Sequence, residues 1–321
     1  MVKKYIILAY SNDKTFDIPR QLVEINGEPL LKRTIRLLKE NGIENIILTG
    51  KDKRYKELGV ELYSSEKNDY DYINHTGYWL NAFDFELMNE PVCFIWGDVY
   101  FSEEAIKTIV ETDTDSTMFF CSYNNDNEYY IKHHDEPLAY KVVDTDLFKE
   151  HITRVKEMKD KGLCCREPIV WEVYRSIHGQ DINTHEMTTD FVAINDISCD
   201  IDSAKDAEEI EYQIRRKNMI KVEVIEKFSY AKYEEIKDTL KRKSTDEKGM
   251  LFVGDTFECD KETVEYLTGG NPLGKVVVKV VEVKPEAPKV EALTDNEEPE
   301  VFVGYTQVIE QPKKKTTRKK K

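Results

Sequence analysis

The sequence predicts an α/β fold with a mixed, mostly parallel sheet, helices on both faces and a small β-rich domain after it. Short apolar runs alternate with helical patterns as far as residue 216, which is typical of one α/β domain. Val92–Trp96 is apolar throughout and bounded by Pro91 and Gly97, as expected of a strand buried on both faces. Beyond Met219 the pattern changes to the alternation of half-buried strands.

Composition limits the function classes. The 321 residues are 40% hydrophobic and 34% charged, and the net charge of −15 argues against a nucleic-acid partner. No apolar run approaches the roughly 18 residues that span a bilayer, so no membrane partner is expected. The apolar run Tyr5–Tyr10 is too short for a secretory signal. The six cysteines form no C-x-x-C pair, which favours reduced thiols in a cytoplasmic protein and argues against a zinc site.

The N-terminal part is predicted to form a right-handed βαβ unit. Pro29 suits the start of its helix, and Asn-Gly is a strong turn dipeptide. The predicted elements are a strand at Lys4–Ala9, an extended piece at Gln21–Ile25, a turn at Asn26-Gly27, a helix from Leu30 to about Asn41 and a strand at Asn45–Thr49.

The following elements continue the alternation. Ser102 and Ser203 are predicted N-caps, the second in a capping box. Helical segments are predicted at Lys51–Leu58, Asn74–Phe85, Glu103–Val110, Asp146–Lys161, Ile169–Ile177 and from Ser203 to about Arg216, and strands at Val60–Tyr63, Thr117–Ser122, Tyr129–Lys132, Leu138–Val143 and Phe191–Ile194.

Three regions are predicted along the chain. Residues 1–218 form the α/β domain, residues 219–283 a small β-rich module, and residues 284–321 a disordered linker and basic tail. The module is predicted to contain strands at Ile220–Ile225, Leu251–Cys259 and Val276–Val283 and a helix at Asp260–Leu267.

Gly97-Asp98 is the first candidate functional site. A carboxylate just past the carboxyl end of a central strand lies where open α/β sheets bind ligands, and Gly97 allows a close backbone approach. Mg²⁺ prefers one or two carboxylates together with substrate phosphates, so Asp98 is a candidate metal ligand. The alternative is that Asp98 only caps a turn.

Two further stretches, taken with Gly97-Asp98, carry a resemblance. PRQLVEINGEPLLKRTI at Pro19–Ile35 is followed by Gly-Asp at the sheet centre and by DIDS at Asp200–Ser203. In this order residues 4–216 resemble the nucleotidyltransferases that make nucleotide-sugars and related activated compounds on a GT-A-like Rossmann fold. Members that transfer a cytidylyl group to choline phosphate or sugar phosphates look nearest.

The resemblance implies a function and roles for particular residues. It implies Mg²⁺-dependent transfer from an NTP to a sugar-phosphate or other small phosphorylated alcohol, with release of pyrophosphate. By resemblance Asp98 and Asp202 hold Mg²⁺, with Asp200 as second choice, and Arg20 and Lys14 serve as the catalytic cations. The nucleotide-binding residues implied are Leu8, Ala9, Tyr10, Ser11 and Gly97.

One departure from the family pattern leaves alternatives open. No glycine occurs from residue 1 to 26, where the family has a Gly-rich loop that brings backbone amides close to phosphates. A protein that kept the fold but lost catalysis is therefore one alternative. A GT-A-type glycosyltransferase is another, although Gly97-Asp98-Val99-Tyr100 lacks the second acid of a D-x-D motif.

Other conspicuous residues have ordinary structural interpretations. His75 and Trp171 are expected to pack, His133-His134 to be solvated, and Tyr78-Trp79 to form either core or a pocket wall.

The C-terminal module carries a short resemblance of its own. Val253–Leu267, VGDTFECDKETVEYL, looks like part of modules at the ends of phage structural proteins. That implies a phage-encoded chain in the host cytoplasm or on the virion, with residues 219–283 attaching it there. The alternative is a generic oligomerisation module.

Overall fold

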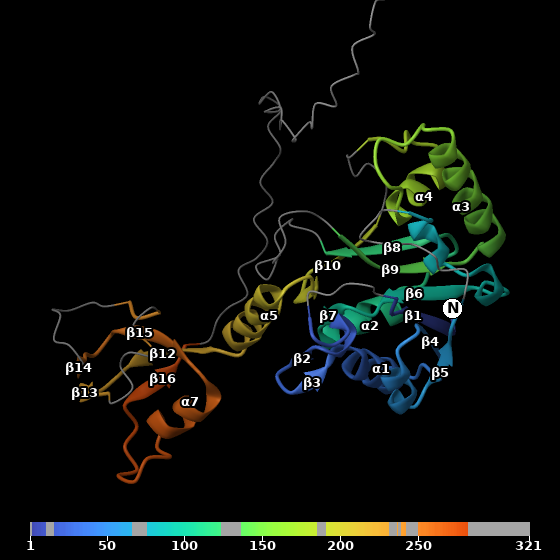
Figure 1. Cartoon of the computed structure of the whole chain (residues 1–321). Coiled ribbons are helices and arrows are strands. Elements are labelled where there is room, and N and C mark those ends of the chain that lie inside the picture. The colour runs from blue at the N-terminus through green and yellow to red at the C-terminus, as the bar shows by residue number, and fades with distance from the viewer. Residues whose placement is uncertain are drawn as a thin grey trace, which may run out of the picture. The chain divides into compact units, whose positions relative to one another are not determined.

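The computed structural model describes residues 2–10, 16–65, 76–122, 136–184, 191–230, 236, 239–241 and 250–281. A seven-stranded sheet is its central element (Figure 1). In spatial order its strands are β10 (Val192–Ile194), β8 (Met118–Ser122), β9 (Glu136–Val142), β6 (Val92–Trp96), β1 (Lys4–Leu8), β4 (Asn45–Thr49) and β5 (Glu61–Tyr63). Within it, β9 runs antiparallel to both neighbours, and every other pair is parallel. The predicted mixed, mostly parallel sheet is confirmed.

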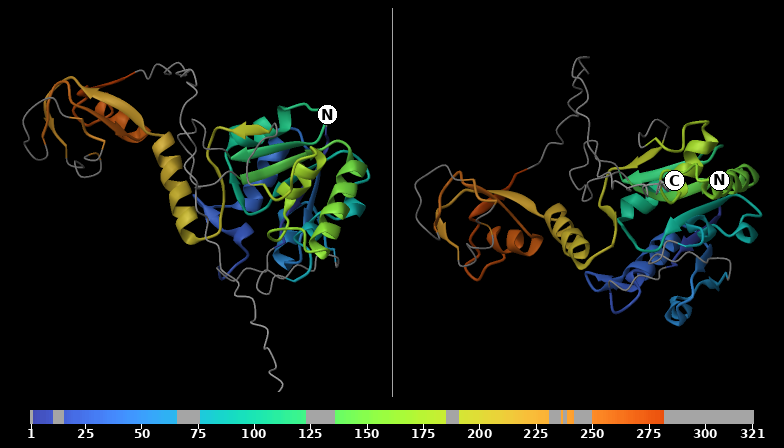
Figure 2. Two further views of the ribbon diagram at one scale, coloured as in Figure 1. Left: turned by 90° about the horizontal axis from the view of Figure 1, so that it is seen from above. Right: turned by 45° about the horizontal axis from the view of Figure 1, so that its top comes forward.

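Helices cover both faces of this sheet, as predicted. One face carries α1 (Leu30–Glu40) and α2 (Glu103–Glu111), and the other carries α3 (Thr145–Asp160) and α4 (Val170–Ile177). Figures 1 and 2 show α3 and α4 side by side.

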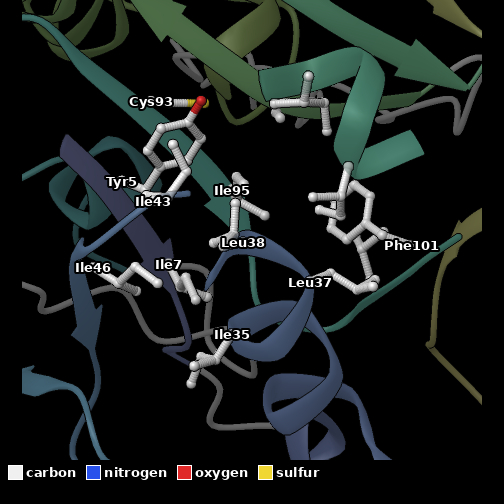
Figure 3. Packing of buried hydrophobic residues seen from close by; sticks show 14 of the residues in the cluster. Tyr5, Ile7, Ile35, Leu37, Leu38, Ile43, Ile46, Cys93, Ile95 and Phe101 are labelled. Atoms are coloured by element: carbon white, nitrogen blue, oxygen red, sulfur yellow. The ribbon is translucent and has the colours of Figure 1, made fainter. Parts of the chain in front are cut away.

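Alternation along the central strands explains why they are apolar throughout. In β1, Tyr5 and Ile7 belong to the core under α1 and α2, whereas Ile6 and Leu8 belong to the core under α3 and α4. Successive side chains of a strand point to opposite faces, so a strand covered on both faces needs apolar residues at every position. Figure 3 shows Ile7 beside Ile35 of α1 in the first of these cores.

The predicted caps are confirmed. Ser102 accepts a hydrogen bond from the Ala105 amide at 3.1 Å and starts α2. At α5 (Ala204–Lys217), Ser203 and Asp206 form the predicted capping box.

The segment before α1 differs in part from its prediction. Arg20–Leu22 form a 3₁₀ turn, η1, rather than an extended piece. The Asn26-Gly27 turn is confirmed, with φ of 50° and 77°, and it joins β2 (Glu24–Ile25) to β3 (Glu28–Pro29). Pro19, whose ring fixes φ, precedes η1 and directs the chain into the turn.

The aromatic stretch at 74–85 was predicted as one helix, and that prediction is wrong for the part described. In place of that helix the structure has two 3₁₀ turns, η3 (Trp79–Ala82) and η4 (Phe85–Leu87). Earlier in the chain, the helical segment predicted at Lys51–Leu58 is also a 3₁₀ turn, η2 (Lys53–Leu58). The buried carboxylate of Asp84 accepts a hydrogen bond from the Glu86 amide at 3.0 Å. Such a side-chain bond competes with helix formation and starts a new turn. Residues 66–75, including His75, lie outside the described residues.

An antiparallel ribbon that the sequence did not predict lies next to the main sheet. It pairs β7 (Val99–Phe101) with β11 (Ser198–Asp200), and Asp200 lies opposite Val99. The ribbon has its own apolar cluster, which includes Tyr100, Cys199 and Ile210 of α5.

The C-terminal part is β-rich, as predicted, but the strand predicted at Leu251–Cys259 is divided into two strands that belong to different sheets, and the strand predicted at Val276–Val283 is only three residues long. A three-stranded antiparallel sheet holds β15 (Thr256–Cys259), β12 (Ile220–Val224) and β16 (Val278–Val280), accompanied by β13 (Phe228–Ser229), β14 (Met250–Leu251) and α7 (Lys261–Leu267). A separate hydrophobic cluster, which includes Val222, Phe257 and Leu267, lies among these elements.

Several predictions about chain organisation stay predictions. The described residues up to Val280 belong to one compact unit, so the boundary at residue 218 is not tested. Attachment or oligomerisation through residues 219–283, phage origin and cytoplasmic location also stay predictions. The tail and the strand predicted at 129–132 lie outside the described residues.

No disulfide joins any of the six cysteines, all of which lie among the described residues. No helix within the described ranges is both long and apolar enough to cross a membrane.

Candidate functional site

The site lies where β1 and β6 end side by side. The Gly97 amide donates a hydrogen bond to the Leu8 carbonyl at 2.8 Å. A Cβ atom at position 97 would lie 2.9 Å from that carbonyl oxygen and 3.2 Å from the Ala9 Cβ. The close approach therefore requires glycine, and it turns the chain so that Asp98 follows directly at the strand end. Leu8 and Ala9 are buried beside this turn.

The β7–β11 ribbon brings the other predicted acids to the same place. The Ile201 amide donates to the Asp98 carbonyl at 2.9 Å, which holds Asp200 and Asp202 beside Asp98. Backbone pairing thus joins two acidic segments about a hundred residues apart in the chain, as sheet pairing commonly does.

Arg20 joins this group, as the sequence predicts. One guanidinium nitrogen, Nη1, lies 2.5 Å from Asp202 Oδ1 and 3.6 Å from Asp98 Oδ2. The Arg20 and Asp98 side chains are only 15% and 21% exposed, whereas Asp202 is 54% exposed. The ion pairs therefore lie at the mouth of a partly buried site.

Burial and neighbouring charges raise the pKa of Asp98 to about 6. Burial is the largest cause, the Arg20 guanidinium opposes it, and the carboxylates of Asp200 and Asp202 add to it. Three acids around one cation leave an excess of negative charge that a further cation would neutralise.

The oxygen ligands fit Mg²⁺ better than a softer metal. Among the residues that the structure describes, no three Asp, Glu, His or Cys side chains form a ready-made metal site. Mg²⁺ does not require one, because it is commonly held by one or two carboxylates, waters and substrate phosphates. Asp98 and Asp202, which contact the same guanidinium nitrogen, meet that requirement.

A pocket of about 210 Å³ opens beside these charges. It is lined by Tyr10, Arg20, Trp79, Trp96, Asp98, Val99, Pro137, Leu138, Tyr140, Ile169, Val170 and Asp200. Tyr10, predicted to bind nucleotide, is thus at the site, and its hydroxyl accepts a hydrogen bond from the Ser65 amide at 2.9 Å. Ser11 and Lys14 lie outside the described residues.

The aromatic side of the pocket was mostly missed from the sequence. Trp79 lines the pocket and also packs against the core under α3 and α4, so both alternatives considered for Tyr78-Trp79 apply to it. Trp96 and Tyr140 also line the pocket. One indication of this was present in the sequence for Trp96, which ends β6 directly before Gly97-Asp98. Trp171 is buried and packs on Phe119, as expected of core.

Two adjacent residues in the segment before α4 hold the walls of the pocket. Glu167 binds Lys159 at 2.6 Å and accepts a hydrogen bond from the Trp79 amide at 3.4 Å. Arg166 binds Glu172 at 2.8 Å, and Glu172 also accepts from the Ile169 amide at 2.8 Å. The backbones of Trp79 and Ile169, one from each wall, are thereby tied to the α3–α4 layer.

Fold and site together define an α/β protein with a carboxylate–guanidinium group and an aromatic pocket at the carboxyl ends of its central strands. No protein-family model matches the chain, and no curated protein sequence matches it.

Among solved structures, the chain is similar to an inositol-1-phosphate CTP transferase from T. maritima, with 17% identity over 67% of this chain and 96% of that one, at a TM-score of 0.43. A CTP:phosphocholine cytidylyltransferase from Streptococcus pneumoniae shows 17% identity over 66% and 98%, at 0.39. A UDP-glucose pyrophosphorylase from Acinetobacter shows 11% identity over 68% and 94%, at 0.45. At these identities and scores the likenesses assign no activity to this chain.

Proposed function

We propose that the chain is a Mg²⁺-dependent nucleotidyltransferase that joins an NTP to a small phosphorylated alcohol and releases pyrophosphate. The observation that carries the proposal is the convergence of Arg20, Asp98 and Asp202 beside a pocket at the ends of β1 and β6. These residues come from the three sequence stretches that resemble the family.

The reaction needs positioning and charge neutralisation more than covalent help. An oxygen of the acceptor phosphate attacks the α-phosphorus of the NTP, and the bond from that phosphorus to the oxygen bridging to the β-phosphate breaks. The electron pair of that bond leaves with pyrophosphate. No proton transfer is required, because the attacking phosphate oxygen is already ionised at neutral pH.

In this proposal Arg20 exchanges its contact with Asp202 for a phosphate oxygen. A guanidinium binds phosphate in a fork of two hydrogen bonds, and such charged bonds are strong in a partly dry site. Asp98 and Asp202, freed from sharing Arg20, would hold Mg²⁺, which supplies neutralisation of charge on the phosphates when bound. Lys14 and Ser11 are proposed to complete the nucleotide side, and Leu8, Ala9 and Tyr10 to form its floor.

The glycosyltransferase alternative is disfavoured by one observation. The second acid of a D-x-D motif would fall at position 100, where Tyr100 is only 5% exposed and packs in the ribbon cluster. A metal ligand is not available there.

Pyrophosphate release from each of four NTPs, with a panel of phosphate monoesters, tests the proposal. Asp98→Asn should abolish release while the chain stays folded, and Glu103→Gln, an acid in the first turn of α2, should leave it unchanged. Nucleotide binding is followed separately by the shift in melting temperature with Mg²⁺. A shift without pyrophosphate from any pair would favour the non-catalytic alternative, and the absence of both would refute the proposal.

A further inference from the structure

The β-rich C-terminal part contains a second cavity, which shares no residue with the pocket at the ends of β1 and β6. Its volume is about 410 Å³, within the range of about 300–1,000 Å³ that is usual for binding sites. Residues in and next to β13 and α7, and in the loop 269–277, line this cavity, which we call the α7 groove. Figure 1 shows α7 beside β16, and the loop joins the two.

The α7 groove is apolar both at its floor and at its rim. Its floor consists of Tyr230, Leu267 and Val277, which are buried in the hydrophobic cluster of the C-terminal part. At the rim, Tyr266 is half exposed, and Leu273 is 80% exposed, more than any other large hydrophobic residue that the structure describes. Exposed apolar side chains that share one hollow are a common mark of an interaction site.

The loop that carries Leu273 is held in shape by one side chain. The Asn271 carboxamide donates hydrogen bonds to the carbonyls of Tyr266 and Lys275 at 2.8 and 2.6 Å. It also accepts from the amides of Leu273 and Lys275 at 3.2 and 3.1 Å. Because the loop is already ordered, little conformational freedom is lost when a partner covers Leu273, and such preorganisation favours binding.

The charge around the α7 groove is negative. Asp260 and Glu262 line the groove, and the ammonium group of Lys275, which also lines it, pairs with Glu226 at 3.2 Å. The Asp260 carboxylate accepts a hydrogen bond from the Thr263 amide at 2.7 Å. Within the described ranges, however, the Glu262 carboxylate makes no hydrogen bond or ion pair. A positive charge beside the groove would therefore find a partner in Glu262.

We propose that the α7 groove binds a peptide segment of another protein in which a bulky apolar side chain stands next to arginine or lysine. The apolar side chain enters the groove over Tyr230 and against Leu273, and the basic side chain pairs with Glu262 beside the ring of Tyr266. A guanidinium can bind a carboxylate and stack on an aromatic ring at once, so arginine is favoured over lysine. The inference does not depend on the proposed function, because the groove uses no residue of that site.

Charge also argues against other kinds of partner. Two copies of the chain meeting through this face would bring the carboxylates of Asp260 and Glu262 from both copies into one interface, where like charges repel. The phosphates of a nucleic acid or of an anionic membrane would be repelled by the same carboxylates.

Peptide selection on the full-length protein tests the proposal. A library of random dodecapeptides displayed on phage is selected against the immobilised chain, and one selected peptide is synthesised with a fluorescent label. We expect the selected sequences to share a bulky apolar residue beside arginine or lysine, with arginine more frequent. The affinity of the labelled peptide is measured by fluorescence anisotropy. Selection of acidic sequences, or of none, would overturn the proposal.

Two pairs of variants locate the bound peptide. Leu273→Ser should weaken binding about tenfold or more, whereas Val253→Ser, at a residue that is 62% exposed but does not line the groove, should have no effect. Glu262→Lys should weaken binding about fivefold or more, and a peptide with its arginine changed to glutamate should bind this variant better than the unaltered chain. Glu265→Lys makes the same charge change on α7 outside the groove and should have little effect. Melting temperatures establish that all four variants are folded.

Other results would overturn the proposal in recognisable ways. Equal losses in Glu262→Lys and Glu265→Lys would mean that the peptide responds to net charge and not to the groove. A dimer of the unaltered chain that dissociates in Leu273→Ser, seen by analytical ultracentrifugation, would assign the groove to a second copy. A synthetic peptide with the sequence of residues 301–315 that outcompetes every selected peptide would assign it to the chain's own C-terminal residues. None of these measurements uses an NTP, so failure of the proposed function would leave them unchanged.

Discussion

Arg20 Nη1 lies 2.5 Å from Asp202 Oδ1, although the two residues are 182 positions apart in the chain. The same nitrogen lies 3.6 Å from Asp98 Oδ2. Three segments that are distant in the chain thus meet at the Arg20 guanidinium, and the contribution of each can be tested by a separate substitution.

Replacing Arg20 should affect catalysis more than folding. In the proposed mechanism Arg20→Ala removes charged hydrogen bonds to phosphate, and we expect kcat/KM to fall roughly 10²–10³-fold. Arg20→Lys should recover only part of this, because a single ammonium cannot form the fork of a guanidinium. Steady-state pyrophosphate release measures the effect. Equal activity of Arg20→Ala and the unaltered chain would show that Arg20 has no role in catalysis.

Asp98→Asn should make the protein more stable at neutral pH while inactivating it. The pKa of Asp98 is raised to about 6 from an ordinary value of 3.8, so above pH 6 the ionised carboxylate of Asp98 destabilises the folded state. As the pH falls from 6 to 4, protonation of Asp98 favours the folded chain, and the difference between the two proteins should shrink. We expect a gain of about 1–2 kcal/mol in the free energy of unfolding at pH 7.5, measured in EDTA, and none below pH 4. A destabilised variant at pH 7.5 would contradict the assigned burial of charge.

Gly97→Ala should destabilise the site by steric conflict. Its Cβ would lie 2.9 Å from the Leu8 carbonyl, a backbone atom that cannot move without separating β1 from β6. We expect a loss of about 2–4 kcal/mol in urea unfolding. The control is Gly162→Ala, where nothing lies within 4 Å and only the positive φ of 68° is unfavourable. That change should cost about 1 kcal/mol, and similar losses in both would argue against the clash.

Asp196 should contribute a pH-dependent part of the stability. Lys217 Nζ lies 2.6 Å from both carboxylate oxygens, and the Ile197 amide donates at 2.7 Å. Burial raises the pKa of Asp196, but the bonds from Lys217, Ile197 and Ser102 outweigh it and lower the pKa below its ordinary value.

A lowered carboxyl pKa stabilises the fold above pH 4, and this contribution is lost as the pH falls through the lowered value. Asp196→Asn should therefore cost about 2 kcal/mol at pH 7 and progressively less below pH 4. Glu40→Gln, at the surface pair with Arg36, is the control and should cost under about 0.5 kcal/mol. A cost for Asp196→Asn that stays constant down to pH 2 would contradict the pairing.

The sequence predicted those parts of the fold that depend on local pattern. β1, β6 and the Asn26-Gly27 turn follow from apolar runs and turn chemistry within a few residues, and the structure confirms them. The convergence of Arg20, Asp98 and Asp202 followed from resemblance, because spacing alone does not say which strand ends meet.

Other features had no local signal. β7 and β11 are three residues each and pair across a long stretch of chain, so neither is recognisable as a strand alone. The aromatic side of the pocket combines Trp79, Trp96 and Tyr140 from three elements, and each tryptophan or tyrosine by itself resembles ordinary core.

The pairing of β7 with β11 has a consequence for biosynthesis. Val99–Phe101 leave the ribosome about a hundred residues before their partner strand Ser198–Asp200. A nascent chain that has emerged only as far as residue 195 can pair β1 with β6 but has no Asp202 to offer Arg20. If the proposed function holds, nucleotide affinity should therefore appear late in translation, when the α5 segment has emerged, and a prematurely terminated chain would not bind NTP.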